Sequence, residues 1–218
     1  MATSPRCIVF VGPSAPRADR PTSPAIQWRA PIRRGDLDDL PDSIRCVGIV
    51  DGEFDQALAV APREILALLR RGVAVLGASS MGALRAAELS DLGMRGVGRI
   101  FEMYRDEEVT ADDEVAVIYD SESQRALSEP LVNIRCSVRR AVEEGDVTPA
   151  EARLIVEAAA ALLYPDRAYP RVLADAGARV GRSLAGLAAA LARHDQKRLD
   201  AGLLFRAVLE TVNEAGVS

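Results

Sequence analysis

Two adjacent serines, Ser79 and Ser80, lie between a predicted strand and a predicted helix. The strand is the apolar run 73–78, and helix-forming residues continue over 83–89. A serine on such a turn projects its hydroxyl at the carboxyl end of the sheet, where open α/β folds bind their ligands. The helix N-terminus supplies N–H groups and positive potential for an oxyanion. The pattern predicts a nucleophilic or anion-binding serine, and the alternative is a serine that only caps the helix.

Small neighbours distinguish the two hydroxyls. On a sharp strand-to-helix turn, the residues two positions before and after the nucleophile must be small, because larger side chains would collide at the bend. Ser80 has Ala78 and Gly82 at those positions, whereas Ser79 has the bulkier Met81 on one side. Ser80 is therefore the predicted nucleophile and Ser79 its rival. The backbone N–H groups of Met81 and Gly82 are the predicted oxyanion donors.

A serine hydroxyl needs a neighbouring base to become a nucleophile. The chain has one histidine, His194, and one lysine, Lys197. If Asp195 caps the last helix, Lys197 falls in its first turn, where the helix dipole favours the neutral amine that a general base requires. Asp200 could instead pair with Lys197 and hold it charged. His194 and Lys197 are thus the two candidate bases.

The N-terminal half has the pattern of a sheet that could position these residues. Short apolar runs alternate with helical patterns, which indicates a mostly parallel, helix-covered sheet. A long loop over 13–43 separates the first two runs, with a short edge strand predicted around Ile32. Glycines at 93, 96 and 98 are expected to break the chain. The predicted strands are 7–11, 46–50, 73–78 and 114–119, and the predicted helices are 62–71 and 83–89.

The C-terminal half has no further strand pattern. A capping box at Thr148 opens a helix that runs to about residue 163, and helical patterns resume over 184–212. We therefore predict an α/β protein, with a mostly parallel helix-covered sheet in the N-terminal half followed by an all-α C-terminal half. The expected division is 1–124, which bears the serines, and 125–218, with both parts packed as one unit.

Composition excludes several classes of protein. The chain has 218 residues, 49% of them hydrophobic, and its net charge of −5 gives no general attraction to nucleic acid. No apolar run is long enough to span a membrane, and the N-terminus lacks a signal-peptide pattern. Cys7, Cys46 and Cys136 form no metal-binding motif and suit a reducing compartment. We expect a cytoplasmic protein without metal or cofactor, since a single histidine excludes histidine-rich metal sites.

Several segments together resemble the TfuA family, whose members are partner proteins of YcaO enzymes in peptide-backbone thioamidation. The resemblance is clear over about residues 7–145 and is most specific in the block that holds the serines. In the C-terminal half it is looser. The matching segments are 11–14 (VGPS), 31–36 (PIRRGD), 47–52 (VGIVDG), 77–89 (GASSMGALRAAEL), 98–101 (GRIF), 113–117 (DEVAV) and 196–201 (QKRLDA).

The resemblance implies a hydrolase that acts on the C-terminal thiocarboxylate of a ThiS-like, ubiquitin-fold sulfur carrier. Such a protein releases sulfide beside the YcaO enzyme, which activates the peptide amide with ATP. The family is credited with a serine–lysine pair, which corresponds here to Ser80 and Lys197. Because Ser79 adjoins Ser80, the resemblance does not separate the two serines.

A thiocarboxylate is an anion, so N–H groups and cations near the serines would help to bind it. Gly12, in the first matching segment, is a further candidate for binding. Arg85, one turn into the helix after the serines, and Arg33, in the early loop, are candidates for orienting the tail of the carrier.

Two other functions remain open. The chain could be a non-catalytic adaptor that raises the affinity of the YcaO enzyme for its peptide, with Ser80 merely capping a helix. It could also be a general serine hydrolase in which His194 is the base. Sulfide release by the purified protein, and its dependence on Ser80, Lys197 and His194, would separate the three functions.

Overall fold

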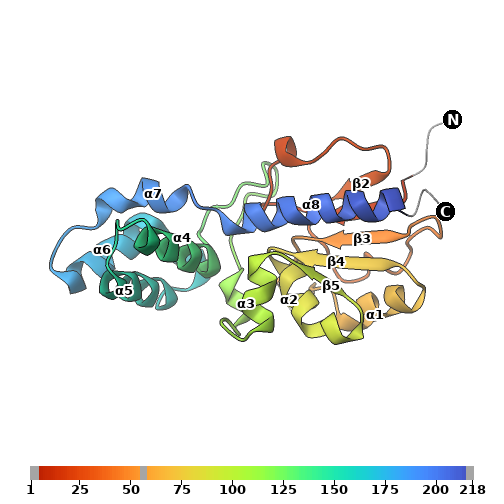
Figure 1. The fold of residues 1–218 in the computed structure, drawn as a ribbon. Coiled ribbons are helices and arrows are strands. Elements are labelled where there is room, and N and C mark those ends of the chain that lie inside the picture. Colours follow the sequence, from red (N-terminus) through yellow and green to blue (C-terminus); the bar gives the residue numbers. More distant parts are fainter. Residues whose placement is uncertain (1–4, 55–57, 215–218) are drawn as a thin grey trace. The chain divides into compact units, whose positions relative to one another are not determined.

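The parallel sheet that the apolar runs predict is present. The computed structural model describes residues 5–54 and 58–214, and it contains a five-stranded sheet in the order β2-β1-β3-β4-β5, with every neighbouring pair parallel (Figure 1). The strands are β1 (Cys7–Phe10), β2 (Ile26–Arg29), β3 (Cys46–Ile49), β4 (Ala74–Ala78) and β5 (Arg95–Val97). The strand order reverses between β1 and β3, which is the topological switch point of such a sheet. The predicted α/β class is confirmed.

The strand predicted over 114–119 is wrong. Asp112–Glu114 is a short 3-10 helix, and the residues after it do not join the sheet. Val115 and Ala116 are buried but Ile118 is exposed, so this run is not buried along its whole length as the strands β1 and β3 are. Tyr119 makes only an isolated antiparallel bridge.

The strand at the β5 edge of the sheet lies where a break was expected. β5 runs through Gly96, where a Cβ atom would overlap the ring of Phe101, so glycine is needed for packing and not for a turn. At the opposite edge, the strand expected around Ile32 is β2, several residues earlier. Ile32 itself forms only an isolated parallel bridge to Gly52.

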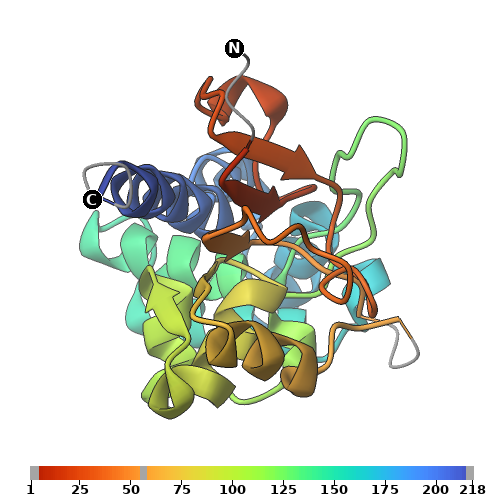
Figure 2. The same ribbon diagram turned by 90° about the vertical axis from the view of Figure 1, so that its right-hand side faces the viewer.

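Helices cover both faces of the sheet (Figures 1 and 2). One face carries α1 (Pro62–Arg70), α2 (Met81–Leu89) and α3 (Arg99–Arg105), and the other carries α8 (Gln196–Glu214). Helix α1 begins with a proline, whose missing N–H would have no helical partner. The Glu64 carboxylate accepts the N–H of Ala61 at 2.9 Å and so caps the same end. Gly72, with φ of +77°, follows its last turn.

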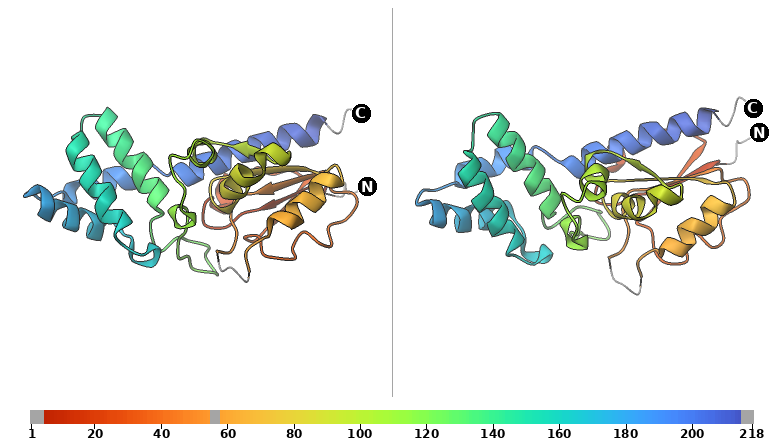
Figure 3. Two further views of the ribbon diagram at one scale, coloured as in Figure 1. Left: turned by 90° about the horizontal axis from the view of Figure 1, so that it is seen from below. Right: turned by 60° about the horizontal axis from the view of Figure 1, so that its bottom comes forward.

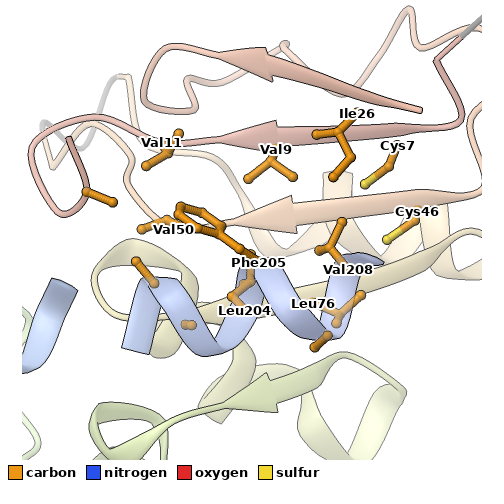
Figure 4. Close-up of a cluster of buried hydrophobic side chains, with 14 of the residues drawn as sticks. Cys7, Val9, Val11, Ile26, Cys46, Val50, Leu76, Leu204, Phe205 and Val208 are labelled. Carbon is orange, nitrogen blue, oxygen red and sulfur yellow. The ribbon is translucent and has the colours of Figure 1, made fainter. Parts of the chain in front are cut away.

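Helix α8 packs on the sheet through large apolar side chains (Figure 4). Leu204, Phe205 and Val208 are all at most 3% exposed and belong to one cluster with side chains from β1, β3 and β4. Gly48 in β3 makes room for the helix, because a Cβ there would lie 3.0 Å from Leu204. Burial of each such side chain contributes about 1.5–3 kcal/mol. This packing fixes α8 against the sheet.

The remaining helices, which Figure 3 draws, form a second unit. This unit has its own apolar core. The helices are α4 (Leu131–Glu143), α5 (Pro149–Ala160), α6 (Tyr169–Val180) and α7 (Ala188–Ala192). The predicted capping box at α5 is confirmed, since Thr148 accepts the N–H of Glu151 and the Glu151 carboxylate accepts the N–H of Thr148. Short 3-10 helices lie at Arg17–Asp19, Ser90–Leu92, Asp112–Glu114, Tyr164–Asp166 and Ala185–Leu187.

The chain divides into two compact units, but not at residue 124. Residues up to 110 join with those from 197 onward, and 111–196 form the helical unit. The C-terminal helix therefore belongs to the unit that contains the sheet, whereas the division predicted from the sequence places it in the helical part. That the two parts pack as one unit stays a prediction. Within the described residues, no helix combines the length and apolar character needed to cross a membrane.

Candidate functional site

The chain turns sharply at Ser79, directly after β4. Its φ is +69°, in the left-handed region that residues with a side chain rarely adopt. The N–H of Ser80 donates to the carbonyl of Ala78 at 2.9 Å, which closes a γ-turn around Ser79 before α2 begins. A backbone of this kind costs about 1–3 kcal/mol and persists only where its surroundings hold it. The strained residue of this junction is thus Ser79, and Ser80 follows it.

Neither serine hydroxyl caps helix α2. Ser80 occupies the N-cap position, yet its side chain makes no capping hydrogen bond. The Ser79 side chain is fully buried, and its hydroxyl has no hydrogen-bond partner in the described part of the chain. Leaving a buried hydroxyl unsatisfied costs about 1–3 kcal/mol. The geometry therefore gives no support to the alternative in which these serines only cap a helix.

The first turn of α2 lies directly against β3. The N–H of Gly82 donates to the carbonyl of Val50 at 3.2 Å. Gly82 must be a glycine here, because a Cβ would overlap the carbonyl oxygen of Ile49. Of the two predicted oxyanion donors, Gly82 is thus already bonded within the protein. Met81 is the first helical residue, and the first N–H groups of a helix have no partner inside it.

Asp51 joins the ends of two neighbouring strands, and it is not among the site residues predicted from the sequence. It follows β3 and is 3% exposed. Its carboxylate accepts the N–H of Gly12 at 2.8 Å, the N–H of Ser14 at 3.1 Å and the Ser14 hydroxyl at 2.6 Å. The Gly12 N–H, a predicted binding group, is therefore occupied. The signal available in the sequence is an aspartate directly after a buried strand.

Lys197 lies in the first turn of α8, as the sequence analysis expects. Lys197 is 3% exposed, although the next two residues, Arg198 and Leu199, are exposed. Lysine is almost never buried to this extent unless its charge is compensated. Lys197 is therefore not the solvated surface lysine that its position in the sequence allows.

The first turn of α8 lies at the same edge of the sheet as the serines. The carboxylate of Asp200, one turn after Lys197, accepts the first two N–H groups of α3 at 3.1 and 2.7 Å. Helix α3 follows β5, and β5 pairs with β4, which ends at the serine turn. Ala78 and Ala201 also belong to one buried cluster. The fold therefore brings Lys197 and the serines, far apart in sequence, to one carboxyl edge.

The two predicted tail-orienting arginines both have partners in the protein. Arg85 donates to the carbonyl of Val60 at 3.1 Å and to both oxygens of Glu88 at 2.8 Å. Arg33 is more exposed and pairs with Glu53 at 3.1 Å. Arg85 is thus fixed by the chain itself, whereas the side chain of Arg33 is 61% exposed in its ion pair.

His194 belongs to the helical unit. It is half-buried and lines a cavity of about 180 Å³ together with Ser137, Arg140, Glu144 and Arg193. Nothing within the helical unit offers His194 a serine turn of the kind that follows β4.

The fold and the site together define an α/β protein with two buried hydroxyls and a buried amine at the carboxyl edge of a parallel sheet. The chain belongs to the TfuA-like family: the model of that family, described as TfuA-like protein, matches residues 51–168, more than half of the chain. The match includes Asp51 and the serine turn and ends before Lys197. A search of curated proteins finds no match. Family membership supports a role associated with thioamide formation, as a partner-type protein of a YcaO enzyme.

Proposed function

We propose that this TfuA-family protein releases sulfide from the C-terminal thiocarboxylate of a ThiS-like sulfur carrier and so supplies a YcaO enzyme. The observation that carries the proposal is a buried lysine at the sheet edge where two buried serines cap no helix. A lysine that only made the surface soluble would lie in water. A serine that only stabilised the start of α2 would donate or accept a capping hydrogen bond there. A hydroxyl with a nearby amine is the equipment of a serine–lysine hydrolase.

The proposed reaction uses each group once. Neutral Lys197 accepts the proton of Ser80, whose oxygen attacks the thiocarboxylate carbon and forms a tetrahedral oxyanion. The N–H of Met81 stabilises this oxyanion. The intermediate expels sulfide, which takes the proton from Lys197, and an acyl-serine remains. Water hydrolyses the acyl-serine and restores the serine hydroxyl, so that thiocarboxylate and water yield carboxylate, hydrosulfide and one proton.

Ser79 is the alternative nucleophile. Its backbone is strained, as that of a nucleophile on a sharp strand-to-helix turn is, and its hydroxyl has no hydrogen-bond partner among the described residues. Ser80 has small neighbours on both sides, Ala78 and Gly82. Single substitutions of each serine decide between them, because only the nucleophile is indispensable for the acyl intermediate.

The test is sulfide release from a carrier thiocarboxylate by the purified protein. We expect Ser80→Ala and Lys197→Ala each to lower the rate by at least about 100-fold, since nucleophile and general base contribute that much or more. His194→Ala is the matched control and should keep the rate of the unchanged protein. Loss of activity with Ser79→Ala but not with Ser80→Ala would assign the nucleophile to Ser79.

Two outcomes contradict the proposal. If the unchanged protein releases no sulfide but tightens peptide binding by the YcaO enzyme, the chain is a non-catalytic adaptor. If both serine variants and Lys197→Ala stay active while His194→Ala does not, the chain is a hydrolase of another kind.

A further inference from the structure

Asp200 is a fully buried carboxylate that connects two helices far apart in sequence. Its exposed fraction is 0%, and it lies in α8, one turn after Lys197. One oxygen accepts the N–H of Arg99 at 3.1 Å, and the other accepts the N–H of Ile100 at 2.7 Å. These are the first two N–H groups of α3, which have no partner within that helix. The carboxylate also complements the positive end of the α3 dipole.

The backbone before α3 is built to receive this carboxylate. Gly98 has a φ of +92°, and a Cβ at this position would overlap the Cγ of Asp200. Position 98 therefore requires glycine for two reasons: its backbone conformation, and the close approach of the Asp200 carboxylate. Gly93 has a similar φ of +103° but has nothing within 4 Å of its Cβ position. Only Gly98 combines the unusual conformation with the contact to Asp200.

A second contact of the same turn of α8 is weaker. Arg198 pairs with Asp19 at 2.5 and 2.8 Å, but the two side chains are 54% and 28% exposed. Exposed ion pairs contribute little, because water screens them and two long side chains lose freedom. The two hydrogen bonds of Asp200 are charge-assisted, one of them buried and the other partly buried, so they are the stronger restraint on this turn.

Lys197 shares a helix face with Asp200, because residues three apart on a helix are neighbours. Whatever fixes Asp200 therefore also fixes the position of the lysine amine relative to the sheet edge. We propose that Asp200 is a positioning residue, which holds Lys197 beside the serine turn by anchoring α8 to the N-terminus of α3. The catalytic meaning of this anchor rests on the proposed function, but the anchor itself can be tested without any activity.

Chemical labelling of amines gives that independent readout. Lys197 is the only lysine, so an amine-reactive ester modifies only its side chain and the N-terminal amine, which mass spectrometry of peptides separates. In the unchanged protein, Lys197 should react slowly because it is buried. Asp200→Ala should raise its labelling rate on the order of tenfold or more, since local opening exposes the amine. Asp200→Asn keeps one acceptor oxygen and should give a smaller increase.

Two matched controls separate anchoring from general damage. Arg198→Ala removes the exposed contact of the same turn and should leave the labelling rate within about twofold of the unchanged protein. Gly98→Ala should raise the rate as Asp200→Ala does, although Asp200 is intact, whereas Gly93→Ala should not. Circular dichroism confirms that each variant is folded. If Asp200→Ala unfolds the chain, Asp200→Asn and Gly98→Ala still decide the result.

The proposal is overturned if folded Asp200 and Gly98 variants label Lys197 at the rate of the unchanged protein, or if the controls raise the rate equally. Sulfide release provides the second readout. Asp200→Asn should lower kcat by about 10–100-fold with little change in KM, because the lysine is misplaced while the carrier still binds. If the unchanged protein releases no sulfide, the proposed function fails, and the labelling result still stands for or against the anchor.

Discussion

The hydroxyl of Ser14 donates to the carboxylate of Asp51 at 2.6 Å, across the point where the strand order reverses between β1 and β3. In open parallel sheets this switch point is the usual place for a ligand. Here the protein occupies it with its own carboxylate, which also accepts the N–H groups of Gly12 and Ser14. The chemistry-bearing residues lie instead beyond the next strand pair, at the end of β4.

We expect Asp51→Asn to destabilise the sheet unit. The amide places an NH₂ group against donors, so at least one charge-assisted bond is lost and a buried donor is left unsatisfied. The expected loss in the free energy of unfolding is about 2–3 kcal/mol. Urea unfolding measures it, with the exposed Asp39→Asn as control. Equal stability of both variants would show that the carboxylate is not needed to join the two loops.

Two glycines in helices should respond in opposite ways to alanine. Gly82→Ala introduces a Cβ that overlaps the carbonyl oxygen of Ile49, so the start of α2 must shift away from β3. We expect a loss of more than about 2 kcal/mol and a lower Tm. Gly202, in the middle of α8, has nothing within 4 Å of its Cβ position. Gly202→Ala should stabilise the protein by about 0.5–1 kcal/mol. Thermal unfolding that ranks the two variants in the reverse order would contradict this account of the helices.

Glu129 gives a pH dependence of known sign. Burial, and then the negative charge of Asp195, raise the pKa of Glu129 above its ordinary value. A raised carboxyl pKa means that the folded state binds the proton more tightly than the unfolded state does. The protonated carboxyl therefore stabilises the folded protein at low pH, and this contribution is lost as the pH rises through the folded-state pKa. Glu129→Gln should therefore raise Tm at pH 7, and its advantage should shrink as the pH falls to about 4.

The matched control for this pH series is the exposed Glu122→Gln, whose effect on Tm should be small at both pH values. A Glu129→Gln variant that is less stable than the unchanged protein at pH 7 would show that the ionised carboxylate is not the costly form.

Arg167 should be the most sensitive arginine of the helical unit. Its side chain is 2% exposed, and it donates to the carbonyls of Asp113, Ala159 and Leu162 and to the Asp113 carboxylate at 2.5 Å. Arg167→Met removes all of these bonds and should cost about 2–4 kcal/mol. Arg171→Met, which loses only an exposed ion pair at 3.6 Å, should cost less than about 1 kcal/mol. Thermal unfolding, monitored by circular dichroism, compares the two variants. Similar Tm values would show that the buried hydrogen bonds of Arg167 do not contribute more stability than the exposed ion pair of Arg171.

The sequence predicts the central strands and the serine turn because both depend on local pattern. β1, β3 and β4 are buried on both faces, so each reads as a continuous apolar run. β5 does not meet this criterion, because it has only three residues and one of them is Gly96, whose missing side chain leaves room for the ring of Phe101. The run 114–119 has the composition of a strand, but it belongs to the helical unit, where Val115 and Ala116 are buried and Ile118 is exposed.

The sequence predicts the individual residues of the candidate site but not how they come together. The local sequence identifies the serines, and the rarity of lysine singles out Lys197. What the sequence does not contain is the direction in which α8 packs, since an amphipathic helix does not specify its partner surface. Asp200 is an example: its spacing predicts a partner for Lys197, whereas in the structure its carboxylate accepts the first two N–H groups of α3.

The central claim is that Lys197 acts as a base, and Lys197→Arg tests it most directly. Arginine keeps the positive charge and the approximate length but does not lose its proton at ordinary pH. If the lysine is the base, sulfide release from the carrier thiocarboxylate should fall by at least about 100-fold in kcat/KM, as in Lys197→Ala. If Lys197→Arg instead keeps most of the activity, the side chain serves only as a cation, and the serine–lysine mechanism is wrong.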